Sequence, residues 1–437
     1  MSETVADDCD QRARHELMKG TVWKNRDFVL LISGQTVSEF GSAITSFALP
    51  WLLLKLTGSA MQMGFAFAVM MMPYLMVSLP AGVYADRWNR KTLMMIADAG
   101  RLVLILSIPV ASAFGVLGLA QIYGVLAAMG ALNAVFDSAY VACLPNVVGR
   151  DELREANAGL QSGVSASQIL GPALAGVMVG WFGTANTLYI DSASFVVSIL
   201  SLWVIRRPFS AAGTGADKAH MFKQIAEGLQ FVWGHRLIRL ISLFTMTLNI
   251  AGSAAGAVLM YHMQRDLHLS PQLIGLVMAG MSVGTVTGSV VAGFISRFVT
   301  MGKIMAIALG IQVIPMFVFA FAPWTVALAT ANFLLGFTAV NWNVQSVSLR
   351  QAVIPDRLLG RASSAIRMVV WGSMPVGSAV GGSMGQWFGA PLVLATGGVI
   401  QIGVFVWGFF TPLFRATGPE TFHQGSLSIP EGTPADV

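Results

Sequence analysis

The first half of this 437-residue chain carries ionisable side chains inside long apolar stretches. They are Glu39, Asp98, Arg101, Asp137 and Asp191. Charge is scarce elsewhere, since only 11% of the residues are charged, against about 25% in an ordinary soluble protein. An apolar interior favours the neutral form of a carboxyl group, so such acids are candidates for taking up and releasing protons.

Glu39 is the first candidate for proton coupling or for binding a cationic substrate. It lies about 11 residues into the apolar stretch 28–54, or ~16 Å at ~1.5 Å per residue, which is near the middle of a ~30 Å hydrocarbon core. A structural carboxyl, permanently protonated or hydrogen-bonded, is the alternative. The spacing of its polar neighbours predicts one polar helix face that lines a central cavity. These neighbours are Gln35, Ser38, Ser42 and Ser46.

The other charges of the first half suit structural or gating roles as well as coupling. Asp98 and Arg101 are one helical turn apart, so they are expected to pair with each other or with the nearby loop at 81–91. Asp137 lies toward the predicted cytoplasmic end of its helix and is a candidate gate or coupling residue. Asp191 shares a helix face with Ser194 and Ser198 and is a candidate for coupling.

The predicted spans of the second half hold no acid and offer neutral polar groups instead. Asn249 and Asn341 are the candidates for lining the cavity. Arg367 is expected either to partner an acid of the first half or to extend its guanidinium toward the cytoplasm. This asymmetry indicates that proton handling belongs to the first half.

Composition places the chain in a bilayer, since 55% of the residues are apolar and the mean hydropathy is +0.68. A span needs about 20 mostly apolar residues, and twelve such stretches occur. We therefore predict an all-α membrane protein with spans at 28–54, 60–83, 92–114, 118–143, 156–180, 185–205, 238–262, 272–296, 303–322, 325–348, 362–385 and 391–413.

The basic residues predict the topology. Of 26 Lys and Arg, 23 lie in or near the tails and the even-numbered loops, which puts both tails in the cytoplasm. Only Lys55 and Arg265 fall on the opposite face, and Arg101 lies within a span. This scatter argues against nucleic-acid binding despite the pI near 9.4.

The predicted organisation is two six-helix bundles between polar ends. The first 26 residues lack an apolar core and are not a signal peptide. The parts are an N-terminal tail at 1–26, a bundle at 27–205, a linker with an amphipathic helix at 206–237, a second bundle at 238–413 and a C-terminal tail at 414–437.

The two bundles are internal repeats. The segment "GPALAG" at 171–176 aligns with "GSAVGG" at 377–382, an offset of 206 residues. The segment "MGFAFAVMM" at 63–71 aligns with "IGLVMAGMS" at 274–282, an offset of 211. Parallel repeats of this kind are typical of transporters with a site between the halves.

The segment "AGVYADRWNRK" at 81–91 resembles the loop signature of the major facilitator superfamily, with Asn89 in place of a glycine. The resemblance implies two pseudo-symmetric six-helix bundles, alternating access, and a cytoplasmic gating motif in which Asp86 caps a helix of the other half. The equivalent loop of the second half, "GFISRFVTMGK", has Arg297 where the acid would be. The matching positions are Gly82, Asp86, Arg87, Arg90 and Lys91, with Asp98 and Arg101 nearby.

The segment "SASQILGPALAG" resembles the antiporter signature of drug exporters through Gly171, Pro172 and Gly176. Close helix packing by small residues is the alternative. Other segments, including "ALPWLLLKLTGSA", resemble the macrolide-efflux and enterobactin-exporter branch. The fourth span has no arginine, unlike that of other drug/proton antiporters, so another residue must take over its role.

The resemblance implies a proton-coupled exporter of a small amphiphilic molecule, working as a monomer in a bacterial cytoplasmic membrane. A dedicated exporter of a metabolite such as a siderophore, a lysolipid flippase and a transport-dead receptor are the alternatives. No P-loop, H-E-x-x-H or G-x-S-x-G motif indicates an enzyme. The two cysteines have no metal-ligand spacing, and no cofactor is expected.

Overall fold

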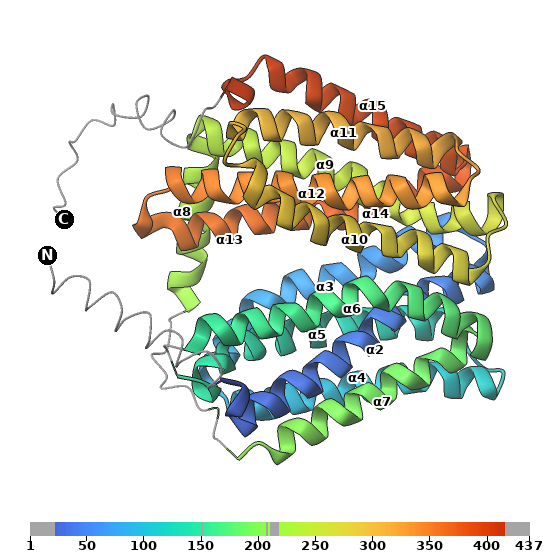
Figure 1. The fold of residues 1–437 in the computed structure, drawn as a ribbon. Helices are drawn as coiled ribbons and strands as arrows, with labels where there is room; N and C mark the ends of the chain where they lie inside the picture. The colour runs from blue at the N-terminus through green and yellow to red at the C-terminus, as the bar shows by residue number, and fades with distance from the viewer. Residues whose placement is uncertain (1–21, 150–151, 207–208, 210–217, 416–437) are drawn as a thin grey trace, which may run out of the picture. The chain divides into compact units, whose positions relative to one another are not determined.

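The structure, a computed structural model, describes the backbone of residues 22–149, 152–206, 209 and 218–415. It describes their side chains except at 79, 80, 82–87, 154, 218–225, 356, 357 and 415. The described part is helical, and Figure 1 shows its helices as long rods. In chain order they are α2 (Arg26–Thr57), α3 (Ala60–Arg87), α4 (Arg90–Ala113), α5 (Leu119–Val147), α6 (Leu153–Phe182), α7 (Thr184–Val204), α8 (Lys218–Gly234), α9 (Arg236–Tyr261), α10 (Pro271–Ile295), α11 (Met301–Phe321), α12 (Thr325–Val353), α13 (Asp356–Gly372), α14 (Met374–Phe388) and α15 (Ala390–Phe409), with short helices η1 (Val22–Lys24), η3 (His262–Asp266) and η4 (Pro412–Arg415).

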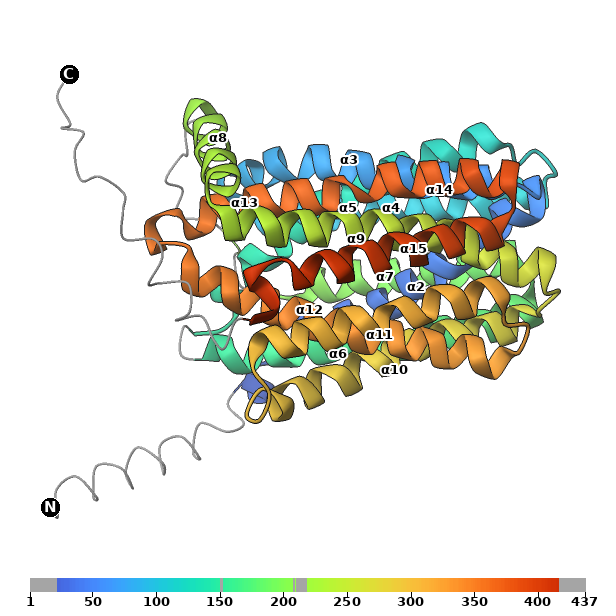
Figure 2. The same ribbon diagram turned by 90° about the horizontal axis from the view of Figure 1, so that it is seen from above.

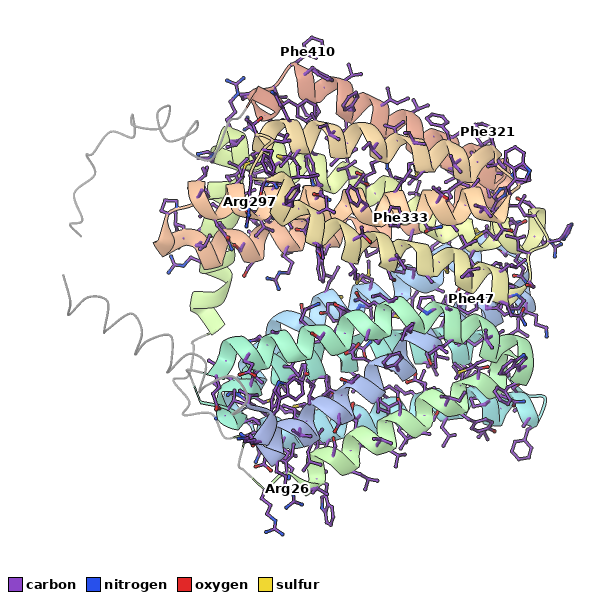
Figure 3. The ribbon with its side chains drawn as sticks, viewed as in Figure 1. Arg26, Phe47, Arg297, Phe321, Phe333 and Phe410 are labelled. Carbon is purple, nitrogen blue, oxygen red and sulfur yellow. The ribbon has the colours of Figure 1, made fainter. Side chains whose placement is uncertain are left out.

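Eleven helices among the described residues are long and apolar enough to cross a membrane. Several exceed the predicted spans. The 32 residues of α2, for example, cover about 48 Å at ~1.5 Å per residue, more than a ~30 Å hydrocarbon core needs. Their outward surface is apolar: Phe321 and Phe410 are exposed and point away from the helices (Figure 3).

The predicted eleventh span, 362–385, is not one helix but two, α13 and α14, which meet at Ser373. Pro375 occupies the first turn of α14 and has no N–H to donate to the carbonyl of Trp371. The carbonyl of Val370 accepts hydrogen bonds from Ser373 Oγ at 2.8 Å and from Asn249 Nδ2 of α9 at 3.1 Å. The interruption is therefore stabilised by side chains.

The chain divides into two compact units. Among the described residues, unit 1 comprises 22–48, 73–149, 152–171, 182–206 and 209, and unit 2 comprises 49–72, 172–181 and 218–415. Helices α2, α3 and α6 thus contribute to both units. The division of the chain into bundles at 27–205 and 238–413 stays a prediction.

In unit 1, α4 packs against both α5 and α7 (Figure 1). Its apolar core includes Phe28, Met94, Phe136 and Leu202, all buried. In unit 2, α12 packs against α10 and α11, and α9 packs against α14 and α15 (Figure 2).

The predicted linker at 206–237 contains helix α8, which runs across the long axes of α9 and α13 (Figures 1 and 2). Its described end packs against protein, since Val232 belongs to a buried cluster with Ala365 of α13. Glu227 forms an ion pair with Arg361 of α13 at 2.5 Å. The apolar face of this segment therefore lies on α13.

Candidate functional site

Helices α2, α4, α5 and α7 of unit 1 bring the predicted charges of the first half together (Figure 1). The close approach of α2 to α7 depends on glycine. A Cβ atom at Gly34 would overlap the side chain of Ser201, and one at Gly41 would lie 2.5 Å from Asp191 Oδ1. Small residues let helix backbones approach closely in a membrane, and here they bring polar groups of two helices into contact.

Asp98 is fully buried on α4, and its carboxylate has two partners. Oδ1 lies 3.2 Å from Arg101 Nη2, which confirms the predicted ion pair. The two groups are not aligned for a hydrogen bond, so this contact is electrostatic. Oδ2 accepts a hydrogen bond from Ser198 Oγ of α7 at 2.6 Å.

Gln35 extends this network to α2, because its Nε2 donates to Ser198 Oγ at 2.9 Å. The side chain of Gln35 is buried at this contact, and its lining of a central cavity stays a prediction. A helix face that is polar in sequence can face a polar neighbour instead of water. Glu39 and Ser42 are half-buried and stay accessible on the same helix.

Arg101 is also buried, between two aromatic rings. Its guanidinium carbon lies 4.1 Å from the centre of the Phe136 ring on α5 and 5.3 Å from that of Phe195 on α7. Cations are attracted to the face of an aromatic ring. Asp98 is in ion-pair contact with this guanidinium, and Asp137, Asp191 and Glu39 lie on α5, α7 and α2.

The remaining acids of the cluster differ in their surroundings. Asp191 is fully buried, and its Oδ1 accepts a hydrogen bond from Ser194 Oγ at 3.2 Å. Asp137 is exposed, and its Oδ2 accepts from the hydroxyl of Tyr74 at 3.1 Å. Glu39 makes no hydrogen bond within the part of the chain that the structure describes. Of the four, Glu39 is the carboxyl that no hydrogen bond holds in place.

The loop signature at 81–91 is described in part. Gly82, Asp86 and Arg87 belong to α3, but the side chains of the latter two lie outside the described residues. Arg90 Nη1 donates to the carbonyl of Ala142 at 2.6 Å and to Asn146 Oδ1 at 2.8 Å. Lys91 Nζ donates to the carbonyl of Ile205 at 2.7 Å. These two bases therefore bind the negative C-terminal ends of α5 and α7.

The antiporter-like motif lies in α6, and its glycines pack closely against α2 and α10. A Cβ at Gly171 would overlap Ala43 of α2, and one at Gly176 would lie 3.1 Å from the Cα atom of Gly275 in α10. Pro172 lies inside the continuous helix α6. The contacts of the two glycines are those that the packing alternative predicts.

Unit 2 contains a second glycine crossing, in which a Cβ at Gly382 of α14 would lie 2.9 Å from the Cα atom of Gly64 in α3. In the repeat alignment Gly64 corresponds to Gly275, and Gly176 corresponds to Gly382. One crossing therefore joins the segment at 63–71 to the segment at 377–382, and the other joins their repeat partners at 274–282 and 171–176. The repeat found in sequence reappears as a pair of related contacts.

The polar candidates of the second half are used within unit 2. Asn249 binds the interruption between α13 and α14, as described above. Asn341 is buried, and its Nδ2 donates to the carbonyls of Phe337 at 2.8 Å and Gly288 at 3.4 Å. Arg367 has an exposed side chain without an ion pair among the described residues, which fits a guanidinium directed to water.

Sequence reasoning missed three contacts of the cluster: Tyr74 with Asp137, Phe136 with Arg101, and Ser198 with Asp98. The spacing of Ser194 and Ser198 after Asp191 marked a polar face of α7. It did not indicate that Ser198 reaches α4, because that depends on how the two helices are rotated.

The comparisons with known proteins agree with this fold. A profile of the family described as "transmembrane secretion effector" matches residues 22–421. The multidrug efflux pump Tap of Mycolicibacterium fortuitum is 27% identical over 83% of this chain and 90% of its own. The enterobactin exporter EntS of Citrobacter koseri is 25% identical over 88% and 86%. The crystal structure of the nucleoside transporter NupG superposes with a TM-score of 0.72 at 12% identity, covering 88% of this chain and 98% of that one.

Proposed function

The chain belongs to the transmembrane secretion effector family of major facilitator transporters, and on that premise we propose that it exports an amphiphilic small molecule in exchange for protons. It is a multi-pass membrane transporter and not an enzyme. The similarity to bacterial exporters supports outward transport across a bacterial cytoplasmic membrane. The distribution of Lys and Arg supports cytoplasmic termini.

One observation carries the proposal of proton coupling: four carboxyl groups and one buried guanidinium lie on four packed membrane-spanning helices, α2, α4, α5 and α7. Ionising all four would leave most of the negative charge uncompensated. Uncompensated charge in an apolar interior costs several kcal/mol or more, so we infer that the four carboxyl groups are not all ionised at once. Helices α9 to α12 and α15 contain no acid at all, which supports proton handling in unit 1.

Glu39 is the proposed coupling group. Asp98 is bound to Arg101 and Ser198, and Asp191 to Ser194, whereas Glu39 is partly accessible without such partners. A proton or a cationic substrate can therefore reach Glu39 without breaking a hydrogen bond. Competition between the two for one carboxylate would link export to proton entry.

Arg101 is the proposed switch within the cluster. When Asp98 is ionised, it holds the guanidinium and accepts the hydroxyl of Ser198, and through Ser198 it is linked to Gln35. Protonation of Asp98 would remove the charge that holds Arg101 and favour its attraction to the other acids. The contacts among α2, α4 and α7 would change together, as alternating access requires. Arg101 would thereby take over the role of the arginine that the fourth span lacks.

A dedicated metabolite exporter is the second candidate, because EntS is similar along most of both chains. The two candidates differ in how many substrates they accept. A multidrug exporter moves several unrelated amphiphiles, whereas a dedicated exporter moves one compound class.

Transport into proteoliposomes under an imposed pH gradient tests the proposal. We expect gradient-dependent flux of one or more lipophilic cations, macrolides or siderophores, and the breadth of the set distinguishes the two candidates. Flux that is unchanged when the gradient is collapsed would contradict proton coupling. Binding of a compound without flux would favour a receptor.

A further inference from the structure

A polar cavity of about 730 Å³ lies in unit 2, where the end of α2 meets the segment that joins α9 to α10. Leu54, Lys55, Leu56, Thr57 and Gly58 line one side, and Gln264, Arg265 and His268 line the other. Its volume falls within the ~300–1,000 Å³ of small-molecule sites. The cavity shares no residue with the charge cluster of unit 1.

Lys55 and Arg265 are the two bases that the topology prediction left on the far face, and they meet in this one cavity. Both side chains are exposed, and the residues that line the cavity include no acid to balance the two positive charges. Neither forms an ion pair or a hydrogen bond within the described part of the chain. The guanidinium of Arg265 lies over Gly58, where a Cβ atom would be 3.4 Å from Nη1.

The backbone that presents Arg265 is unusual. It belongs to η3, a π-helical turn, and His268 is the one non-glycine residue with a positive φ (53°) among those described. Both features cost energy and occur preferentially at functional sites. Asp266, the acid next in sequence, is bound to His262 Nδ1 at 2.7 Å. It is therefore already engaged and leaves Arg265 without a counter-ion.

The cavity also offers an acceptor. Gln264 Oε1 is buried and has no hydrogen-bond partner among the described residues. An unsatisfied buried carbonyl costs about 1–3 kcal/mol, and a turn of the half-buried Gln264 side chain toward the cavity would let a ligand hydroxyl satisfy it. A fitting ligand thus combines an anion for the two bases with a neighbouring hydroxyl.

We propose that this cavity binds a glycerophosphate group, with Lys55 and Arg265 on the phosphate and Gln264 Oε1 accepting from a glycerol hydroxyl. A guanidinium and an ammonium are the side chains that proteins use for phosphate. The group can come from an anionic phospholipid headgroup or from a soluble molecule. Binding would neutralise the two like charges and link the end of α2 to η3.

The test uses the purified full chain and two probes. Glycerol 3-phosphate is titrated in neutral detergent with calorimetric detection, and phosphatidylglycerol is compared with phosphatidylcholine in nanodiscs by native mass spectrometry. The variant is Lys55→Gln/Arg265→Gln. The matched control is Arg297→Gln/Lys303→Gln, which removes two exposed bases, one after α10 and one in the first turn of α11.

We expect at least tenfold weaker binding in the variant and unchanged binding in the control. Binding of phosphatidylglycerol alone identifies a lipid as the source, and binding of both probes identifies the group itself. A parent that binds neither probe, or a variant that binds as the parent does, overturns the proposal. A calorimetric response to chloride that equals the response to glycerol 3-phosphate at the same ionic strength also overturns it. If the double variant does not fold, Arg265→Lys must weaken binding, because it keeps the charge and removes the bidentate contact.

Discussion

At the scale of single residues, the polar contacts of unit 1 converge on Arg101. A guanidinium suits this position because it can pair with a carboxylate and stack on aromatic rings at the same time. Arg101 does both, with Asp98 on one side and Phe136 on the other. A lysine would keep the charge and lose the stacking, so Arg101→Lys is not a conservative substitution here.

Removing one partner of this ion pair should cost more than removing both. Among the described residues, Asp98 is the carboxylate in ion-pair contact with the buried guanidinium, so Asp98→Asn should cost about 3–5 kcal/mol unless another acid moves in. The double variant Asp98→Asn/Arg101→Gln leaves two neutral amides, so we expect it to recover a large part of the loss. Thermal unfolding of the purified variants in detergent measures both. Equal destabilisation of the single and the double variant would show that the pair is not coupled.

At the scale of the elements, hydropathy predicted the spans because apolar length is a local property of the sequence. The interruption between α13 and α14 was not predicted, and proline alone does not indicate it. Pro50, Pro109 and Pro315 all lie inside continuous helices. Near Pro375 the carbonyl of Val370 accepts from Ser373 and from Asn249 of another helix, and only the structure reveals that second partner.

The glycine crossings provide an element-scale prediction. Gly176→Ala would place a Cβ atom 3.1 Å from Gly275 and closer still to the carbonyl of Pro271, so α6 and α10 must separate. We expect reduced thermal stability and a several-fold loss of transport with normal membrane insertion. Gly256→Ala is the matched control, since no atom lies within 4 Å of its Cβ position. Alanine is the better helix former, so this control should be neutral or slightly stabilising. Equal effects of the two substitutions would show that the crossing is not needed.

The contacts of the candidate site, like the helices, could be predicted from the sequence only where they depend on local spacing. The pairing of Asp98 with Arg101 follows from their spacing on one helix, and the structure confirms it. The bond between Ser198 and Asp98 joins residues 100 positions apart and depends on helix rotation, which no local pattern specifies. The burial of Gln35 was missed for the same reason.

At the scale of the whole molecule, the chain combines symmetric packing with asymmetric chemistry. The crossings Gly64–Gly382 and Gly176–Gly275 follow the internal repeat, whereas the buried acids gather in unit 1. A duplicated transporter can keep its packing in both copies and specialise one copy for protons. The second loop signature has diverged in the same way, with Arg297 in place of the acid.

The proposed topology can be tested by labelling single cysteines in whole cells. The background is Cys9→Ser, because the other cysteine, Cys143, is buried. Val116→Cys, between α4 and α5, should react with a membrane-impermeant maleimide from outside. Ser296→Cys, after α10, should react only once the cells are permeabilised. The reverse pattern would place the termini outside.

The central claim is that Glu39 couples export to protons, and separating exchange from accumulation in proteoliposomes tests it most directly. Glu39→Gln should keep exchange of a neutral amphiphile across the membrane without a gradient, because the packing of α2 is unchanged and such a substrate does not need the carboxylate. It should lose most of the accumulation driven by a pH gradient, by about tenfold or more, whereas Glu155→Gln, at the start of α6, should keep both. Gradient-driven accumulation by Glu39→Gln at the level of the parent would contradict the account.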